Sequence, residues 1–211
     1  MPLAIMPLFP ENFLPKPSDS KTSGGFLSPS DLEDGGKVRF VLLDGDLLPY
    51  YLFWVTEAGS PNRKKPVRCL EDPTPEDIEV LIDKCGEHYG NEYVRALTRD
   101  GKGRDPVKKA SCLWVYDLTD SKTKLLDMTQ TTVMGQLDAI SQMEEYDGEE
   151  IFTTDLVLTR AGTGTDTKYT LIPSGKRLKG SEEAVAQARE EIKSYKKEAI
   201  INWGNPYSSD G

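Results

Sequence analysis

Three cysteines and the single histidine are the side chains of this chain that could bind zinc: Cys69, Cys85, His88 and Cys112. Thiolate sulfur and imidazole nitrogen are the usual ligands of structural zinc. Only Cys85 and His88 have a ligand spacing, C-x2-H, and they fall in the last turn of an expected helix. A structural zinc would order the polar segment around them. Buried free thiols explain the cysteines without metal, so the sequence requires no cofactor and leaves zinc open.

The stretch RAGTGTDTKYTLIP, residues 160–173, has the glycines of a phosphate-binding loop. A Walker loop ends in Gly-Lys-Ser/Thr at the start of a helix, and a dinucleotide loop needs a third glycine in a strand–helix unit. Here alternating apolar segments flank the glycines, so the sequence predicts the turn of a β-hairpin. One histidine and no nucleophile elbow give no support to a catalytic triad. We therefore expect a protein that is not an enzyme.

Aromatic and basic residues interleave along the chain, as in proteins that hold single-stranded nucleic acid. In YYLFW, residues 50–54, alternate side chains lie on opposite strand faces, and the sequence leaves open which face is exposed. In SCLWVYDL, residues 111–118, one face is aliphatic and the other, with Trp114 and Tyr116, is aromatic and expected at the surface. The candidate stacking residues are Tyr51, Trp54, Trp114, Tyr116 and Tyr169. The candidate phosphate-binding residues are Arg63, Lys64, Lys65, Arg68, Lys108, Lys109, Arg160 and Lys168.

The charges are segregated, so a net charge of −9 over 211 residues does not exclude a nucleic-acid partner. Cations gather in residues 63–68 and 95–109, and acids gather in MEEYDGEE, residues 143–150. The hydrophobic content of 37% indicates a globular protein. No apolar run reaches the roughly 20 residues of a membrane helix, so no membrane partner is expected. The start, MPLAIMPLFPENFLPKP, lacks a signal-peptide pattern, so the cytoplasm is the expected location.

Periodicity and turn signals predict strands at residues 37–43, 48–55, 111–118, 123–128, 151–160 and 167–173. Thr74 and Pro75 have the pattern of a helix start, and the apolar residues between Val133 and Ile140 have helical spacing. A last helix, capped by Ser181, is expected to reach about Ile200 and to pack on the domain or project from it.

This order of elements is that of an OB-fold, a five-stranded Greek-key barrel, within a mainly β protein with helices. Residues 1–30 are then an extended or disordered arm, residues 31–175 the OB-fold domain, and residues 176–211 the C-terminal helix and tail. Residues 37–55 form a long, bent first strand. Residues 56–110 form a large insertion between strands 1 and 2. A generic mixed sheet with helices on one face is the alternative.

Residues 27–175 resemble phage single-stranded DNA-binding proteins of the OB-fold type. The resemblance is carried by Trp114, Leu126, Thr129, Gln130, Asp155, Arg160, Gly162, Gly164, Asp166, Thr167, Tyr169 and Pro173. It implies coating and protection of single-stranded DNA during phage DNA replication, recombination and repair in the host cytoplasm. It also implies recruitment of phage replication proteins through the C-terminal tail, which here holds Pro206 and Tyr207. Some members of that family hold a structural zinc in the insertion.

Two other hypotheses for the function stay open. An OB-fold module that binds proteins as a scaffold, without nucleic acid, would use the basic runs on acidic protein surfaces. A metal-dependent nuclease would use carboxylates such as Asp44 and Asp46, although their DGD segment is also a common turn. The oligomeric state is open, and a dimer or a cooperative assembly on DNA is compatible with the sequence.

Overall fold

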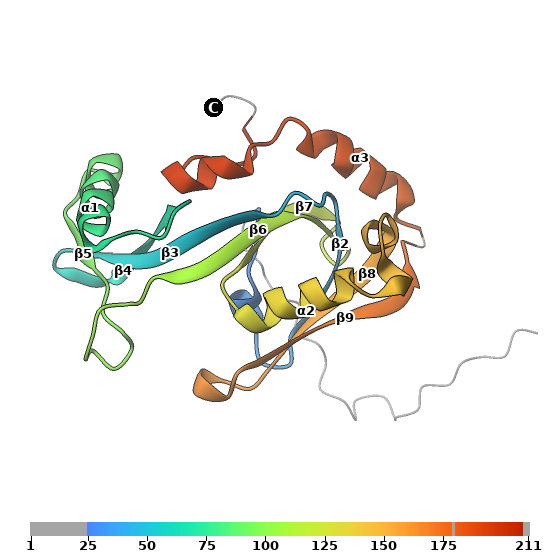
Figure 1. The fold of residues 1–211 in the computed structure, drawn as a ribbon, viewed down its shortest axis with the longest axis horizontal. Helices are drawn as coiled ribbons and strands as arrows, with labels where there is room; N and C mark the ends of the chain where they lie inside the picture. Colours follow the sequence, from blue (N-terminus) through green and yellow to red (C-terminus); the bar gives the residue numbers. More distant parts are fainter. Residues whose placement is uncertain (1–24, 179, 209–211) are drawn as a thin grey trace, which may run out of the picture.

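The computed structural model describes residues 25–178 and 180–208, which form one nine-stranded sheet with helices packed on it (Figure 1). The chain is therefore mainly β with helices, as the sequence predicts. The strands are β1 (Phe26–Leu27), β2 (Lys37–Leu42), β3 (Leu48–Glu57), β4 (Ser60–Cys69), β5 (Tyr93–Arg95), β6 (Lys108–Asp117), β7 (Lys122–Met128), β8 (Thr154–Ala161) and β9 (Lys168–Arg177). The helices are α1 (Pro75–Tyr89), α2 (Thr131–Ser141) and α3 (Glu182–Ile192). Short 3-10 turns are η1 (Pro29–Asp31), η2 (Glu144–Tyr146), η3 (Glu150–Thr153), η4 (Gly164–Asp166) and η5 (Lys197–Asn202).

The main path of the sheet runs β1-β7-β6-β2-β8-β9, with β6 at its centre. One edge of β6 pairs with β7, and the other pairs with β3 and then with β2. Leu42 lies opposite Val115 and Leu48 opposite Cys112, so β2 and β3 follow one line and are interrupted only by a short loop. This arrangement matches the long, bent strand expected at residues 37–55. Within the described residues β7 and β9 do not pair, so the sheet is not a closed barrel.

Residues 56–110, expected as a polar insertion with one helix, also contain strands β4 and β5. Together with β3 and α1 they form a lobe at one end of the molecule (Figure 1). The sequence missed β4 because its central residues are cations and prolines. A strand tolerates Pro66 here because β4 is an edge strand that pairs only with β3. Helix α1 begins at Pro75 with Thr74 as its N-cap, as the sequence predicts. Thr74 and Asp77 also form a capping box. It packs on a core that includes Phe53 and Val67.

The largest core lies on the sheet face that carries Leu113 and Val115, and α2 covers it with Val133 and Ile140. Helix α2 also bonds the free edge of β9. Gln136 accepts a hydrogen bond of 2.7 Å from the Leu171 amide and donates one of 3.4 Å to the Tyr169 carbonyl. The Gln136 side chain thus pairs backbone groups of β9 that a neighbouring strand would pair in a longer sheet.

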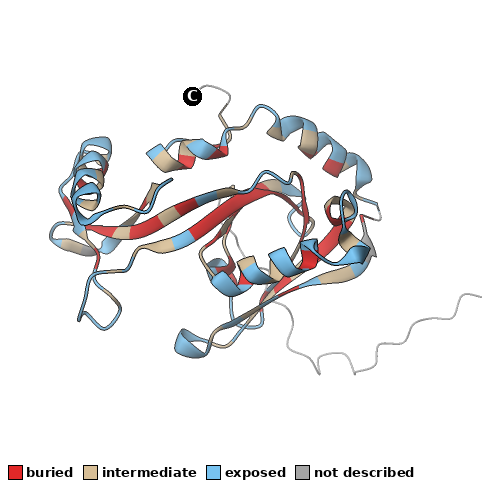
Figure 2. Cartoon of the chain, in the orientation of Figure 1, coloured by how far each residue is buried: buried red, intermediate tan, exposed pale blue. Residues whose placement is uncertain are grey.

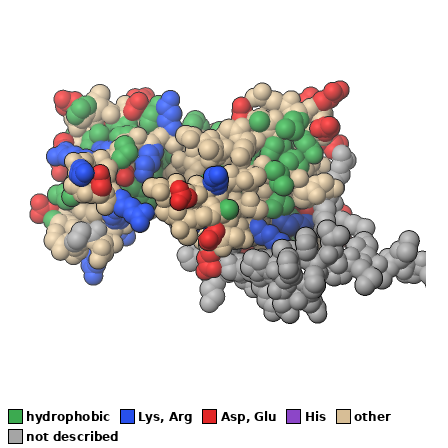
Figure 3. Space-filling model, turned by 90° about the horizontal axis from the view of Figure 1, so that it is seen from below, with side chains coloured by type: hydrophobic (Ala, Val, Ile, Leu, Met, Phe, Trp, Pro, Cys, Tyr) green, Lys and Arg blue, Asp and Glu red, His purple; other side chains and the backbone are tan. Residues whose placement is uncertain are grey.

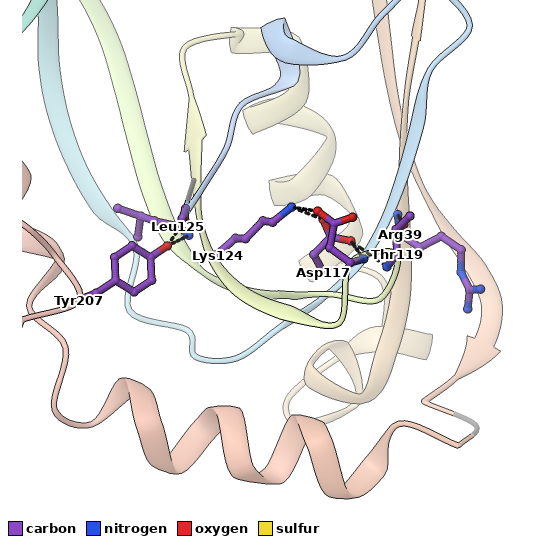
Figure 4. Close-up of polar contacts among 8 residues, drawn as sticks. Arg39, Asp117, Thr119, Lys124, Leu125 and Tyr207 are labelled. Atoms are coloured by element: carbon purple, nitrogen blue, oxygen red, sulfur yellow. Dashed lines mark hydrogen bonds and ion pairs between the residues drawn. The ribbon is translucent and has the colours of Figure 1, made fainter. Parts of the chain in front are cut away.

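The opposite face of β6 is covered by residues 182–207, which include α3 and η5 and are called the C-terminal segment below. Figure 2 shows the buried strands lying beneath these elements. Lys197 is buried and anchors the segment, since its Nζ lies 2.8 Å from Asp46 Oδ2 and 3.5 Å from Asp44 Oδ2. The Leu125 amide donates to the Tyr207 hydroxyl at 3.1 Å (Figure 4). The expected helix from Ser181 to about Ile200 is divided, since α3 ends at Ile192 and η5 follows.

The β6–β7 hairpin carries a buried ion pair. Lys124 is 1% exposed, and its Nζ lies 2.8 Å from Asp117 Oδ2 (Figure 4). The other oxygen of Asp117 accepts a 2.8 Å hydrogen bond from the Thr119 amide. These contacts hold the end of the hairpin in one conformation, because a buried charge needs a partner. Lys124 is therefore a structural cation.

The end of the expected arm belongs to the fold. Within residues 25–30, Leu27 and Pro29 are buried, and β1 pairs in parallel with β7. The rest of the arm, residues 1–24, and the end of the tail, residues 209–211, lie outside the described residues. No helix in the part of the chain that the structure describes is long and apolar enough to cross a membrane.

Candidate nucleic-acid interface

A groove of about 530 Å³ lies between the β1–η1 segment and the sheet formed by β3, β4 and β6. We call it the Trp54 groove. It is lined by Phe26, Ser28, Ser30, Asp31, Leu52, Trp54, Pro66, Arg68, Lys108, Asp127 and Thr129. Its volume is within the roughly 300–1,000 Å³ of ligand sites in proteins. The lining combines the aromatic rings of Phe26 and Trp54, two cations and several hydroxyl and carboxylate oxygens.

Strand register places the cations on both sides of an apolar stripe. Leu52 of β3 lies opposite Arg68 of β4 on one side and opposite Lys108 of β6 on the other. Two residues further along β3, on the same face, Trp54 lies opposite Pro66. Phe53, between Leu52 and Trp54, points to the other face and joins the core under α1. The sequence alternation in YYLFW therefore has Trp54 on the groove face, where its side chain is half-buried.

Arg68 forms an ion pair with Asp127, another residue of the groove lining. Its Nη2 lies 3.0 Å from Asp127 Oδ2, and its guanidinium lies 5.8 Å from the centre of the Tyr50 ring. The Tyr50 hydroxyl donates to Asp127 as well. Burial, together with the nearby Asp127, raises the pKa of Tyr50 above its ordinary value, so this hydroxyl stays protonated. Asp31, across the groove, has a raised pKa because of burial and of the charge on Asp127.

The other predicted cations of residues 63–68 divide between the two faces of β4. Lys64 is exposed and shares the face of Trp54, since it pairs with Thr56. Lys65 lies on the opposite face, with its Nζ 4.4 Å from the centre of the Tyr89 ring. Arg63 is exposed and lies 3.3 Å from Glu57. Lys64 is therefore the member of the run that adds an exposed cation to the groove side.

Lys108 and Lys109 also separate. Lys108 lines the groove and has 41% of its side chain exposed, with its Nζ 3.4 Å from Asp105. Lys109 is exposed on the other face of β6, opposite Tyr51, which is half-buried there. The structure thus brings Trp54, Arg68 and Lys108 together and leaves Tyr51 and Lys109 on a second surface.

Trp114 and Tyr116 are not the exposed platform that the sequence predicts. They share a face opposite Leu113 and Val115, as expected, but the C-terminal segment covers that face. Trp114 is 2% exposed, with its ring centre 5.2 Å from that of Tyr195 and 5.0 Å from that of Tyr207. Strand alternation identified the aromatic face but not the segment that packs on it, so these rings are core.

The β8–β9 hairpin confirms the turn predicted for the glycine-rich stretch. Gly162 has φ of +82°, and a Cβ there would lie 2.5 Å from the Asp166 carbonyl oxygen, so only glycine fits. Arg160, expected on phosphate, donates to the Ser30 carbonyl at 3.0 Å and also to the Leu32 carbonyl. It fixes η1, which is one wall of the groove. Lys168 is exposed, and Tyr169 is half-buried against the main core.

The residues considered for zinc are not gathered. Cys85 lies in the core under α1 and Cys112 in the core under the C-terminal segment. The Cys69 thiol lies 3.9 Å from the Tyr51 carbonyl, and His88 stacks on Trp203 with ring centres 5.4 Å apart. Burial raises the pKa of all three thiols, that of Cys112 to about 12. Among the residues described here, no group of three or more metal-ligating side chains is present.

Several groove residues were not predicted from the sequence. Asp127 is one, although its position on β7, opposite Cys112, follows from strand alternation. Ser28, Ser30 and Asp31 carried no signal, because they precede the first predicted strand.

The lobe formed by β3, β4, β5 and α1 has its charges on different elements. Helix α1 carries an acidic surface, whereas the cations lie on β4, on β6 and in residues 95–104. Figure 3 shows Lys and Arg side chains gathered on this lobe.

The chain was compared with protein-family models, with curated protein sequences and with solved structures, and none of them matches it.

Proposed function

We propose that this protein binds single-stranded DNA in the Trp54 groove, with little dependence on base sequence. The observation that carries the proposal is the cross-strand row Arg68–Leu52–Lys108 beside Trp54. Every base presents a ring face, so one aromatic side chain can stack on any of them, while lysine and arginine follow the phosphates. Lys64 adds a third cation on the same side. Trp114, Tyr116 and Arg160 have structural roles in this proposal.

We further propose that the sheet is an open variant of the OB-fold barrel. If β2 with β3 counts as the first strand, then β6, β7, β8 and β9 are strands two to five. The observed pairs are then one with two, two with three, one with four and four with five, and α2 connects the third and fourth strands. This is the order of an OB-fold, whose ligands bind across strands two and three and the adjoining loops. The Trp54 groove lies beside those strands.

The biological role that we propose comes from the resemblance described above. The protein coats and protects single-stranded DNA during phage replication, recombination and repair in the host cytoplasm, without catalysis and without a required cofactor. Phage replication proteins are the proposed partners. Tyr207 packs on Trp114 and bonds Leu125, so this part of the tail would have to leave its place before a partner could bind it.

A tryptophan fluorescence titration with oligo-dT tests the proposal directly. We expect quenching at low salt and an affinity that falls steeply as salt rises, because phosphate contacts release counterions. The same titration with oligo-rU measures the preference between DNA and RNA. The absence of both quenching and a mobility shift at low salt would refute the proposal.

A protein-binding scaffold is the second candidate. It is favoured by the ion pair between Arg68 and Asp127, which neutralises one groove cation, and by the acidic surface of α1. Light scattering with and without oligonucleotide separates the candidates. A DNA binder changes mass with oligo-dT, whereas a scaffold self-assembles or captures a partner independently of it.

A further inference from the structure

A second cleft, of about 350 Å³, lies between α2, the strands β6 and β7, and the loops at residues 44–47 and 146–152. Most of its lining is apolar, and it includes Leu47, Met128, Met134, Leu137 and Phe152. It is separate from the Trp54 groove, with which it shares no lining residue. A cleft of this shape and composition is the usual form of a binding site for an apolar group.

Two buried polar atoms in the lining lack a partner. Ser111 is 3% exposed, and its Oγ makes no hydrogen bond within the described residues; the same holds for Asp44 Oδ1. The other oxygen of Asp44 lies 3.5 Å from Lys197 Nζ. Buried polar atoms are normally bonded, so an unpaired hydroxyl and an unpaired carboxylate oxygen in an apolar cleft indicate a ligand with polar groups of its own, among them a donor for the carboxylate. The ligand should therefore combine apolar side chains with N–H groups, as an extended peptide does.

We propose that the cleft holds apolar side chains of the N-terminal segment of the same chain, residues 3–14, LAIMPLFPENFL. This segment has eight apolar side chains other than proline, namely Leu3, Ala4, Ile5, Met6, Leu8, Phe9, Phe13 and Leu14. Its prolines oppose a helix, so the amide groups between them stay available as donors. Its only charge is Glu11, so it suits a cleft that offers little charge compensation.

The length of chain permits this docking. Residues 15–24 connect the segment to Gly25, whose carbonyl accepts a 2.8 Å hydrogen bond from the Leu125 amide of β7. Ten extended residues span at most about 33–36 Å. That reach is comparable with the diameter of a small domain, about 30 Å. The segment can therefore reach the cleft of its own molecule without help from a second copy.

Photo-cross-linking of the full chain tests the proposal in the absence of DNA. A benzophenone amino acid replaces Phe9, and mass spectrometry locates the cross-links after irradiation. We expect them at cleft residues, chiefly Met128, Met134 and Leu137. The same probe at Ser20, in the polar connecting segment, is the matched control and should not label the cleft. Cross-links elsewhere on the body, or to a second chain, would overturn the proposal.

A blocking pair of substitutions sharpens the test. Ser141→Trp fills the edge of the cleft, whereas Gln142→Trp adds the same ring at the next exposed position, which does not line it. Cross-linking should be lost in S141W and kept in Q142W. Full cross-linking in a folded S141W protein contradicts the proposal.

Methionine methyl NMR provides a test that leaves the folded body unaltered. Replacing Leu8 and Phe9 by serine should shift the methyl signals of Met128 and Met134, which line the cleft. The signal of Met143, which is 43% exposed and outside the cleft, is the internal control. Unchanged Met128 and Met134 signals would refute the docking.

Discussion

Arg68 and Asp127 form an ion pair across the Trp54 groove, with 3.0 Å between Arg68 Nη2 and Asp127 Oδ2 and little exposure of either side chain. The guanidinium that the sequence predicted for phosphate is thus neutralised inside the protein. Asp127 also accepts from the Tyr50 hydroxyl. The pair holds β4 against β7, and it sets the charge of the groove floor.

Asp127→Asn should raise the affinity for oligo-dT several-fold, because it removes a negative charge and releases Arg68 toward phosphate. It should also lower the free energy of unfolding by about 1–3 kcal/mol, since a largely buried guanidinium loses its counter-charge and keeps only a neutral acceptor. Salt-dependent titrations and urea unfolding measure the two effects. Asp138→Asn, on α2, is the control. A decrease in affinity would show that the ion pair, rather than a free Arg68, serves binding.

Trp54→Ala should weaken oligo-dT binding by about 1–3 kcal/mol, which is the usual contribution of one stacked base and corresponds to about 5- to 150-fold. In Trp54→Phe the DNA-induced quenching of tryptophan fluorescence should largely disappear, because Trp114 is buried and Trp203 packs on His88. Trp203→Phe should keep the quenching. Quenching that persists in W54F would place the DNA on another surface.

Lys64→Gln and Lys108→Gln should each reduce the slope of log affinity against log salt by about one, as expected for the loss of one phosphate contact. Lys193→Gln is the matched control, because Lys193 is an exposed lysine of the C-terminal segment, 2.6 Å from Glu190. Equal slopes for all three variants would show that the groove side is not the phosphate path.

The sequence predicted the parts of the fold that depend on local pattern. The strands around Phe40, Leu126 and Leu158 follow from alternation. The helix capped by Thr74 follows from its capping pattern, and the helix around Val133 to Ile140 follows from helical spacing. Strand β4 was missed because a run of cations with Pro66 has no strand pattern. It forms a strand because it pairs with β3, which is tertiary context that a local pattern does not contain.

The candidate site was predicted less well, because it depends on long-range contacts. Trp114 has the same outward alternation as an exposed ring, but residues 195–207 return to cover it. Arg160 looks like a free cation in the sequence and instead bonds two carbonyls of residues 30 and 32. Trp54 and Lys108 remain candidates because the β1–η1 segment borders their strand face as one wall of a groove and leaves both side chains partly exposed.

Tyr207→Phe should destabilise the protein and loosen the C-terminal segment. The Tyr207 hydroxyl accepts from the Leu125 amide at 3.1 Å and donates to the Gly25 carbonyl, two groups that also bond each other at 2.8 Å. Its removal therefore takes away two hydrogen bonds of the C-terminal segment but leaves the amide and the carbonyl paired. We expect a loss of about 0.5–1.5 kcal/mol in urea unfolding, the usual net contribution of a hydrogen bond. Tyr146→Phe, at a hydroxyl outside this contact, is the control. Equal stability of Y207F and the parent chain would contradict the anchoring role.

Stability at alkaline pH should depend on Cys112. Burial, and then the charge of Asp127, raises the pKa of this thiol to about 12, above its ordinary value near 9. Because the folded pKa is the higher one, the unfolded chain releases the proton first. The contribution to stability is therefore complete below about pH 9 and is lost as the pH rises toward 12. Urea unfolding of the parent chain should decline in free energy over this range, and Cys112→Ala should decline less steeply. The remaining slope in the variant reports tyrosines and lysines. Parallel curves for the two proteins would show that the thiol is not protected in the folded state.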